Sequence, residues 1–433
     1  MEFETKIHLE HWGSTEETVM RIKKQYFAPI TLLLLTVLLS VTHAVAQEGS
    51  AREKVLVSFT AESSVGNTPT GALISDGAGN FYGVNGNGGV GGGTVFEISP
   101  SGEGGWTAKL IDDLQSNSHY DNALVMDSSG NLYGTLYAGG ANACTDGYDD
   151  YLCGGVYELS PNGSGAFTEN ILWNASQRGG WRPYHLIMGP DGNLYGTTYW
   201  GGDWGSNVGG GTVFELQHTG EQWTHSILST GDDLPDSLVF DKAGNLYGTN
   251  YYGDDWVGGG ALFELKKTNG GWQEINLFEF NASGSGASGG FGLNGVILGS
   301  DGNFYGTTDS GGNGHGVVFE LSPTSGGATQ ETVLYTFLDG GPDEYAANPL
   351  LVESAGNLYG ATFGGGPGGY GTVFQLTPSG NGAWSYTLLH SFPSDAEDGK
   401  SPNGLLVDSK GNIYGTTVGG GTAGLGTVFE ITP

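Results

Sequence analysis

Hydrophobic residues occur along this chain in short runs rich in Val, Leu, Tyr, Phe, Trp and Thr. Trp106 to Ile111 and Trp384 to Leu389 are two examples. Gly, Asn, Asp, Ser or Pro bounds each run, which is the pattern of short strands joined by hairpins. The pattern therefore predicts an all-β protein.

The same group of runs repeats along the chain. A Gly-Asn-apolar-Tyr-Gly core begins at Gly79, Gly130, Gly192, Gly244, Gly302, Gly356 and Gly411. An apolar run precedes each core, and a glycine-rich stretch, a Val-Phe-Glu-Leu type run and, in all but the last unit, an aromatic-led run follow it. Four short antiparallel strands in units of about 50 residues are typical of β-propeller blades. We therefore expect one seven-bladed propeller domain over residues 47–433.

The order of the strands predicts how the ring closes. We label the four strands of a unit a to d, and expect the a-strands to begin near Gly71, Asn122, Tyr184, Asp236, Asn294, Asn348 and Gly404. The first d-type run, Val55 to Phe59, precedes any a-strand, whereas the last unit ends at its c-strand, Thr427 to Ile431. The N-terminal strand is therefore expected to complete the last blade, leaving no large unpaired edge.

Residues that recur in nearly every unit are more consistent with a scaffold than with one active site. The core tyrosines are Tyr82, Tyr133, Tyr195, Tyr247, Tyr305, Tyr359 and Tyr414. We expect them to be buried with bonded hydroxyls, each followed by a glycine that allows close packing. A glutamate recurs in six c-strands, with Gln375 as the exception. Calcium binding at the Asp-x-x-Gly turns is a weaker alternative to plain turn chemistry.

The first 46 residues have the pattern of an export signal. Arg21, Lys23 and Lys24 precede an apolar stretch over residues 27–41, and Ala44-Val45-Ala46 follows it. We expect a cleaved signal peptide ending at Ala46, with an uncleaved membrane anchor as the alternative. Met20 directly precedes the basic cluster and is an alternative start to Met1. The predicted location is the periplasm or the extracellular space, with no membrane contact beyond the signal.

Composition excludes several partners. Aromatic residues make up 12% of the chain, which argues against disorder despite 82 glycines. The formal net charge is −32, so nucleic acid and anionic membrane surfaces are excluded as general partners. No phosphate loop, His-Glu-x-x-His or nucleophile elbow is present. We therefore predict a monomer without a cofactor or bound metal.

The repeat resembles a known family. The unit DSKGNIYGTTVGGGTAGLGTVFEITP at residues 408–433 is similar to the GloVer tandem repeat of exported bacterial proteins, as is SAGNLYGATFGGGPGGYGTVFQLTPSG. The resemblance extends over residues 54–433 and implies a propeller-like exported or surface protein. It implies no particular activity. This chain lacks the C-terminal anchoring domain of many members, so we expect release or periplasmic residence.

The long connections between strands b and c, and between blades, should lie on one face of the ring. Loops on a rigid scaffold are where binding residues concentrate. The predicted ligand-binding residues are Trp181, Arg182, Tyr199, Trp200, Asp203, Trp204, Tyr251, Tyr252, Asp254, Asp255 and Trp256. Tyrosine and tryptophan rings flanked by carboxylates suit sugar rings and their hydroxyls. The alternative is that these aromatic residues fold back to order the glycine-rich loops.

Two cysteines, Cys144 and Cys153, lie in the longest of these loops, and we expect a disulfide between them. A ring of this size stabilises the loop by about 2.7 kcal/mol in the chain-entropy estimate.

Three functional hypotheses follow. The first is an exported binding module for a polysaccharide or surface glycan. The second is a carbohydrate-active or other hydrolytic enzyme, because pairs such as Asp232/Asp233, Asp254/Asp255 and Asp343/Glu344 could supply an acid and a base. The third is a structural propeller of the cell envelope. Adjacent acids arise readily by chance in so acidic a chain, so binding is favoured over catalysis.

Overall fold

We describe the protein from a computed structural model. It describes residues 51–89, 92–114, 124–145, 150–202, 210–220, 222–230, 234–251, 259–269, 271–280, 292–311, 315–324, 329–337, 351–393 and 397–433. The chain forms two units, Met1–Gln47 and Glu48–Pro433, and the first, with the predicted signal peptide, lies outside the described residues. No helix within the described ranges is long and apolar enough to cross a membrane.

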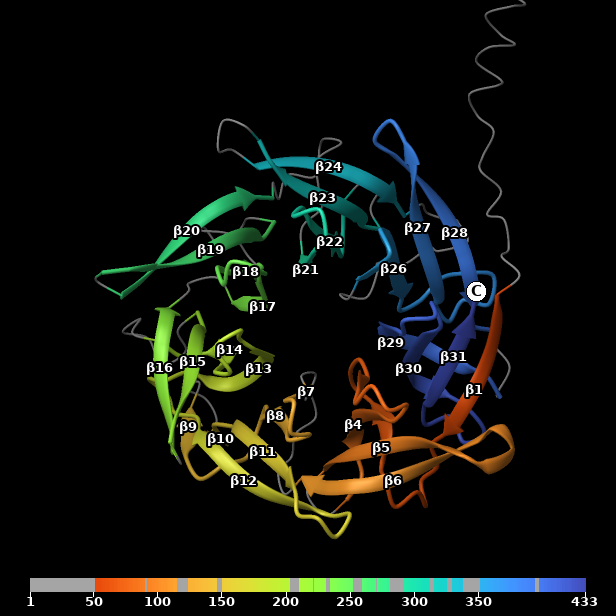
Figure 1. Ribbon diagram of the computed structural model, residues 1–433, viewed down its shortest axis with the longest axis horizontal. Helices are drawn as coiled ribbons and strands as arrows, with labels where there is room; N and C mark the ends of the chain where they lie inside the picture. Colours follow the sequence, from red (N-terminus) through yellow and green to blue (C-terminus); the bar gives the residue numbers. More distant parts are fainter. Residues whose placement is uncertain are drawn as a thin grey trace, which may run out of the picture. The chain divides into compact units, whose positions relative to one another are not determined.

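The described residues of the second unit form seven large antiparallel sheets arranged as the blades of a propeller (Figure 1). Blade 1 consists of β2 (Asn67–Pro69), β3 (Ile74–Ser75), β4 (Phe81–Asn87), β5 (Gly93–Ser101) and β6 (Gly105–Leu114), with a 3-10 turn, Gly102–Gly104, between the last two. Blade 2 consists of β7 (Leu124–Met126), β8 (Leu132–Leu136), β11 (Gly155–Pro161) and β12 (Phe167–Asn174). Blade 3 consists of β13 (Trp181–Met188), β14 (Leu194–Trp200), β15 (Thr212–Thr219) and β16 (Gln222–Thr230).

Blades 4 to 7 repeat this order. Blade 4 consists of β17 (Pro235–Phe240), β18 (Leu246–Asn250), β19 (Ala261–Thr268) and β20 (Gly271–Glu279). Blade 5 consists of β21 (Leu293–Leu298), β22 (Phe304–Thr308), β23 (Val317–Pro323) and β24 (Thr329–Thr336). Blade 6 consists of β25 (Val352–Ser354), β26 (Asn357–Thr362), β27 (Thr372–Gly380) and β28 (Ala383–Ser391). Blade 7 consists of β29 (Gly399–Val407), β30 (Ile413–Gly420), β31 (Thr427–Thr432) and β1 (Arg52–Ser58).

The predicted ring closure is confirmed. Strand β1 pairs antiparallel with β31, with Lys54 opposite Glu430 and Ser58 opposite Thr427. Lys54 donates a hydrogen bond to the carbonyl of Gly104 in blade 1, at 3.0 Å. The first strand of the chain therefore completes the last blade.

The core lies between blades and depends on the Tyr-Gly motif. In each blade an aromatic ring from the third strand lies over the core glycine, and a Cβ on Gly83 would lie 2.6 Å from the ring of Phe96. The covering rings are Phe96, Tyr157, Phe214, Phe263, Phe319, Phe374 and Phe429, all 0–1% exposed. A larger residue at the glycine would force the sheet away from this ring, so the motif fixes the packing of each blade.

The repeated acids serve the scaffold. The Tyr195 hydroxyl donates toward Asp191 at 2.8 Å and lies 3.0 Å from Glu215 Oε1. The corresponding Tyr133 lies near Asp127 and Glu158. In blade 6, where Gln375 replaces the glutamate, the Gln375 amide donates to the tyrosine hydroxyl at 3.3 Å. In these blades the position thus supplies a partly buried hydrogen bond, as expected for scaffold residues.

The turn aspartates have hydrogen-bond donors on both carboxylate oxygens. Asp127 Oδ1 accepts from the backbone amides of Ser129 and Asn131, at 2.8 and 2.9 Å. Its Oδ2 accepts from the Asn131 amide at 2.8 Å. Burial raises the pKa of Asp127, but its hydrogen bonds together outweigh burial and lower the pKa below its ordinary value. The geometry therefore fits an Asx-type turn without a cation.

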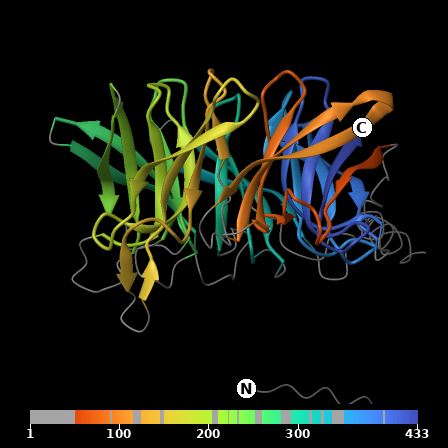
Figure 2. The same cartoon turned by 90° about the horizontal axis from the view of Figure 1, so that it is seen from below.

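Blade 2 carries an additional hairpin that the sequence pattern did not predict. Strands β9 (Ala143–Thr145) and β10 (Asp150–Leu152) pair antiparallel, and the predicted disulfide between Cys144 and Cys153 is confirmed. Figure 2 shows this hairpin, in yellow, below the ring, on the face opposite the short β5–β6 turn. We call the face of the ring that carries this hairpin the loop face.

Removal of the closing strand is expected to destabilise the whole ring. A variant without residues 51–60 loses the partner of β31 and exposes the apolar surface that Phe59, 0% exposed, covers. We expect a large fall in melting temperature by circular dichroism, and partial recovery on adding a synthetic peptide of residues 51–60. A scrambled peptide is the control. An unchanged melting temperature in the deletion variant would contradict closure by β1.

Candidate functional site

A pocket lies where the inner strands of blades 3, 4 and 5 come together. Its volume is about 310 Å³, and it is lined by Tyr184, Tyr199, Leu234, Pro235, Asp236, Tyr251 and Asn294. A second cavity of about 380 Å³ continues among the inner strands and shares Tyr184, Asp236 and Asn294 with the first. We call the first cavity the mouth pocket. Blades 3, 4 and 5 supply its residues.

The position of Asp236 explains why this side of the channel differs from the rest. The equivalent position at the start of each inner strand holds Gly71, Asn122, Tyr184, Asp236, Asn294, Asn348 and Asn403. Only blade 4 has a carboxylate there, and only blade 3 has an aromatic ring. Both line the mouth pocket. The repeat therefore places its one acidic and its one aromatic variant of this position side by side.

Two carboxylates from neighbouring blades shape the electrostatics. Burial, followed by the negative charge of Asp309, raises the pKa of Asp236 to about 7. Burial also raises the pKa of Asp309, although hydrogen bonds from Asn294 and Tyr251 oppose this effect. The Asn294 amide donates to Asp309 Oδ1 at 2.7 Å. Asp236 therefore exchanges a proton near neutral pH, as functional carboxylates often do.

Two of the pocket tyrosines present part of their rings to solvent. Tyr199 lies near the end of β14 and Tyr251 directly follows β18, and each is 37% exposed. The Tyr251 hydroxyl is bonded to Asp309, which fixes its ring against blade 5. Partly exposed rings held beside carboxylate and amide groups can cover the apolar face of a ligand while its hydroxyls are bonded.

A chain of aromatic contacts supports Tyr199. Its ring packs edge-on against Trp200, with centroids 4.9 Å apart, and Trp200 packs against Trp181 at 6.5 Å. Trp181 is 0% exposed and lies in one apolar cluster with Cys144 and Cys153. The disulfide hairpin therefore holds Trp181 and Trp200 behind Tyr199. These two tryptophans order the loops, which is the alternative to direct ligand binding given above.

Arg182 lies in this supporting layer. Its guanidinium carbon is 4.5 Å from the ring centroid of Tyr151 and 5.2 Å from that of Tyr137. Its backbone amide donates to the carbonyl of Cys153 at 2.8 Å, and its φ of 57° is unusual for a residue other than glycine. These contacts bind the hairpin of blade 2 to the first strand of blade 3.

The channel behind the mouth pocket contains a histidine. His185 lines the inner cavity, and burial lowers its pKa to about 4, so the imidazole is neutral at pH 7. Its Nδ1 is buried without a hydrogen-bond partner among the described residues. The imidazole therefore adds no positive charge to this cavity at pH 7.

The sequence-predicted site is partly assembled by the structure. Tyr199 and Tyr251 meet in the mouth pocket, whereas Trp181, Arg182 and Trp200 lie behind it. Asp203, Trp204, Tyr252, Asp254, Asp255 and Trp256 lie outside the described residues, as do the acid pairs considered for catalysis. Sequence reasoning missed Tyr184, Asp236, Asn294 and Asp309. Comparing the inner-strand position between repeats would have singled out the first two.

The family of the chain follows from its repeats. The model of the Gloeobacter/Verrucomicrobia repeat matches residues 143–349 and 292–433, more than half of the chain. The protein belongs to this repeat family, which confirms the predicted resemblance. Comparison with curated proteins finds no match.

Solved structures share the propeller fold at low identity. A streptogramin B lyase is 14% identical, with a TM-score of 0.53 over 88% of this chain and 97% of the other. An inactive virginiamycin B lyase from Staphylococcus aureus, solved with quinupristin, is 15% identical, with a TM-score of 0.53 over 89% and 99%. The extracellular domain of a proposed one component system from B. thetaiotaomicron is 11% identical, with a TM-score of 0.51 over 88% and 40%. These likenesses establish the fold alone.

Substitution of Asp236 is expected to stabilise the protein at alkaline pH. The folded pKa of about 7 lies above the ordinary value of 3.8, so the folded state holds a proton that the unfolded state releases. Stability from this group is therefore full below pH 4 and is lost as the pH rises toward 7. We expect Asp236→Asn to raise the melting temperature by about 2 °C at pH 8 and hardly at all at pH 4.

Asp127→Asn is the matched control, because hydrogen bonds lower the pKa of Asp127 below 3.8. The stability from this group is present at neutral pH and is lost as the pH falls below 4. We expect this variant to melt at a lower temperature than the wild type at pH 8, with a loss of about 1 kcal/mol. Thermal unfolding of all three proteins at both pH values is the measurement. Equal shifts for the two variants at pH 8 would contradict the assignment of Asp236.

Proposed function

We propose that this protein is an exported binding protein that takes a carbohydrate at the mouth pocket. The observation that carries the proposal is the grouping of Tyr199, Tyr251 and Asp236 in one cavity at the channel mouth. Sugar rings present C–H groups on one face and hydroxyls at their edge. Tyrosine faces suit the former, and carboxylate and amide groups suit the latter.

The size of the pocket favours a short ligand. A volume of about 310 Å³ is at the lower end of the range for small-molecule pockets. The cavity that continues from it lies among the inner strands of the ring and has a volume of about 380 Å³. We therefore expect the end of a glycan or a small oligosaccharide to bind, and not the interior of a long chain.

The proposed export rests on two features. The disulfide between Cys144 and Cys153 is typical of proteins from oxidising compartments. The sequence of residues 1–46 has the pattern of a signal peptide. Both support a periplasmic or extracellular location, where glycans are the abundant ligands of this chemistry.

A double variant tests the role of the tyrosines. We expect Tyr199→Ala with Tyr251→Ala to lower the affinity for a bound glycan at least tenfold, because each ring contributes on the order of 1 kcal/mol by stacking. Glycan-array screening of the purified protein identifies the ligand, and calorimetric titration measures the affinity. The melting temperature should change little, because both side chains are partly exposed.

Tyr370→Ala is the matched control, since Tyr370 is 39% exposed and belongs to blade 6, away from the mouth pocket. It should leave the affinity unchanged. Binding of no glycan by the wild type would reject the proposed ligand class. Equal loss of affinity in the control and the double variant would reject the mouth pocket as the site.

A second candidate function is hydrolysis or elimination at the same pocket. The raised pKa of Asp236, about 7, is what favours it, because a general acid or base works best when its pKa is near the working pH. Asp309 would then hold the negative charge beside it.

Asp236→Asn separates the two functions. An enzyme would lose turnover of its glycan and keep binding it, whereas a binding protein would release no product in either form. For a binding protein we expect the wild-type affinity to fall as the pH drops below about 7. The Asp236 carboxylate then takes up a proton, and one oxygen can no longer accept a hydrogen bond from a ligand hydroxyl. Asp236→Asn should remove this pH dependence. Chromatography of the glycan after incubation, and titration at pH 6 and pH 8, give the two readouts.

A further inference from the structure

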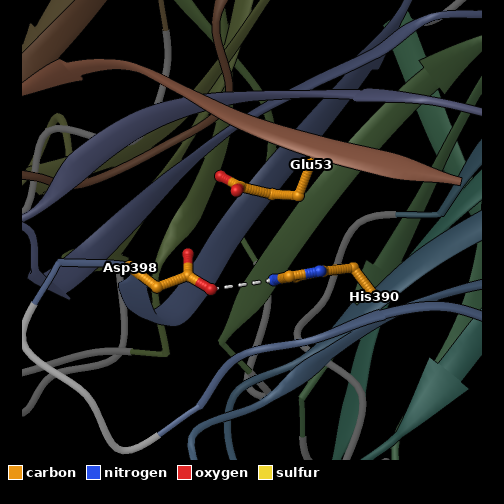
Figure 3. Close-up of side chains that lie close together, drawn as sticks. All are labelled: Glu53, His390 and Asp398. Carbon is orange, nitrogen blue, oxygen red and sulfur yellow. Dashed lines mark hydrogen bonds and ion pairs between the residues drawn. The ribbon is translucent and has the colours of Figure 1, made fainter.

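A second group of chemically active side chains lies at the junction of blades 6 and 7, away from the mouth pocket. Glu53 is on the closing strand β1, His390 is on β28, and Asp398 directly precedes β29 (Figure 3). One potential ligand atom from each lies within 4.8 Å of the other two. Among the described residues, this is the group of three His, Cys, Asp or Glu side chains that meets this criterion.

The surrounding structure fixes two of the three side chains. Asp398 Oδ1 accepts from the backbone amide of Gly399 at 2.7 Å, and the Asp398 carbonyl accepts from Gly421 at 2.7 Å. The other oxygen, Oδ2, lies 3.2 Å from His390 Nε2. The His390 ring packs edge-on against Phe392, with centroids 4.6 Å apart. Asp398 and His390 therefore face each other from fixed positions.

Glu53 adds a second carboxylate to the group. Its Oε1 is buried and has no hydrogen-bond partner among the described residues. Lys54, the next residue, bonds to blade 1 instead. Two carboxylates and one imidazole thus share a half-buried space.

We propose that Glu53, His390 and Asp398 form a zinc site that joins the closing strand to blade 6. One imidazole nitrogen and two carboxylate oxygens suit Zn²⁺, which takes such ligands in four-coordinate sites and leaves the fourth position to water. Ligand atoms at about 2.0–2.2 Å from zinc are about 3.4 Å apart, so a small inward movement from the observed spacing completes the site. Calcium and magnesium prefer ligand sets made of oxygen alone.

In this site His390 Nε2 would give its lone pair to the metal in place of the hydrogen bond with Asp398. The three ligands come from strands β1 and β28 and from the segment before β29. Zinc would therefore bind the folded ring and not the unfolded chain, and its binding would stabilise the ring closure.

Zinc titration of the purified protein, prepared without a polyhistidine tag, tests the proposal. We expect one Zn²⁺ per chain by equilibrium dialysis and a melting temperature that rises with zinc concentration and falls again with a chelator. Ca²⁺ and Mg²⁺ at the same concentrations should give no rise. Glu53→Gln, His390→Gln and Asp398→Asn should each lower the zinc affinity at least tenfold.

Glu62→Gln is the control, because Glu62 is an exposed acid soon after β1 and outside the group. Zinc should also protect His390 of the wild type from diethylpyrocarbonate, with the modified residue located by mass spectrometry. This measurement needs no variant, so it holds even if a substitution prevents folding. Absence of bound zinc below millimolar concentration, or wild-type zinc affinity in Glu53→Gln, would overturn the proposal.

Discussion

The pairing of β1 with β31 is the interaction on which the rest of the structure depends. Each blade buries its two faces against its neighbours, so the ring is stable only when the first and last blades meet. The backbone ladder from Arg52 to Ser58 makes that contact, and Phe59 fills the space beyond it. Without this strand, β31 would present an unpaired edge and blade 7 would lose contacts with blade 1.

The same packing arrangement recurs in all seven blades. This repetition explains why most of the fold could be predicted from the sequence. Strand order, closure and the Tyr-Gly contacts follow from periodic spacing, because hydrophobic runs and turn residues impose them locally. The aspartates of the turns show the limit of such reading. In blades 3 and 5 the acid moves two residues along, to Asp191 and Asp301, yet it still reaches the core tyrosine. A fixed-position comparison counts these blades as lacking the acid.

The candidate site was less predictable, because it depends on where different blades meet. Sequence reasoning favoured the conspicuous tryptophans of the loops, but Trp181 is buried behind the disulfide. Tyr184, Asp236 and Asn294 lie on the most regular strands and look like scaffold in the linear sequence. Their significance depends on the curvature of the ring, which brings equivalent positions of blades 3, 4 and 5 to one opening. The group around Glu53 joins still more distant segments.

The position of β1 also has a consequence for how the protein folds. Its partner, β31, is the last strand of the chain, so their contact has nearly the greatest sequence separation that the domain allows. Blades 1 to 6 are each built from strands of one continuous segment and can form as soon as that segment is available. Blade 7 needs strands from both ends of the domain, β1 and β29 to β31. The entropy cost of closing so long a loop slows the formation of this blade. We therefore expect the first strand that is synthesised to be the last to pair. Until it pairs, the strand edge of β31 and the apolar faces of the first and last blades remain exposed.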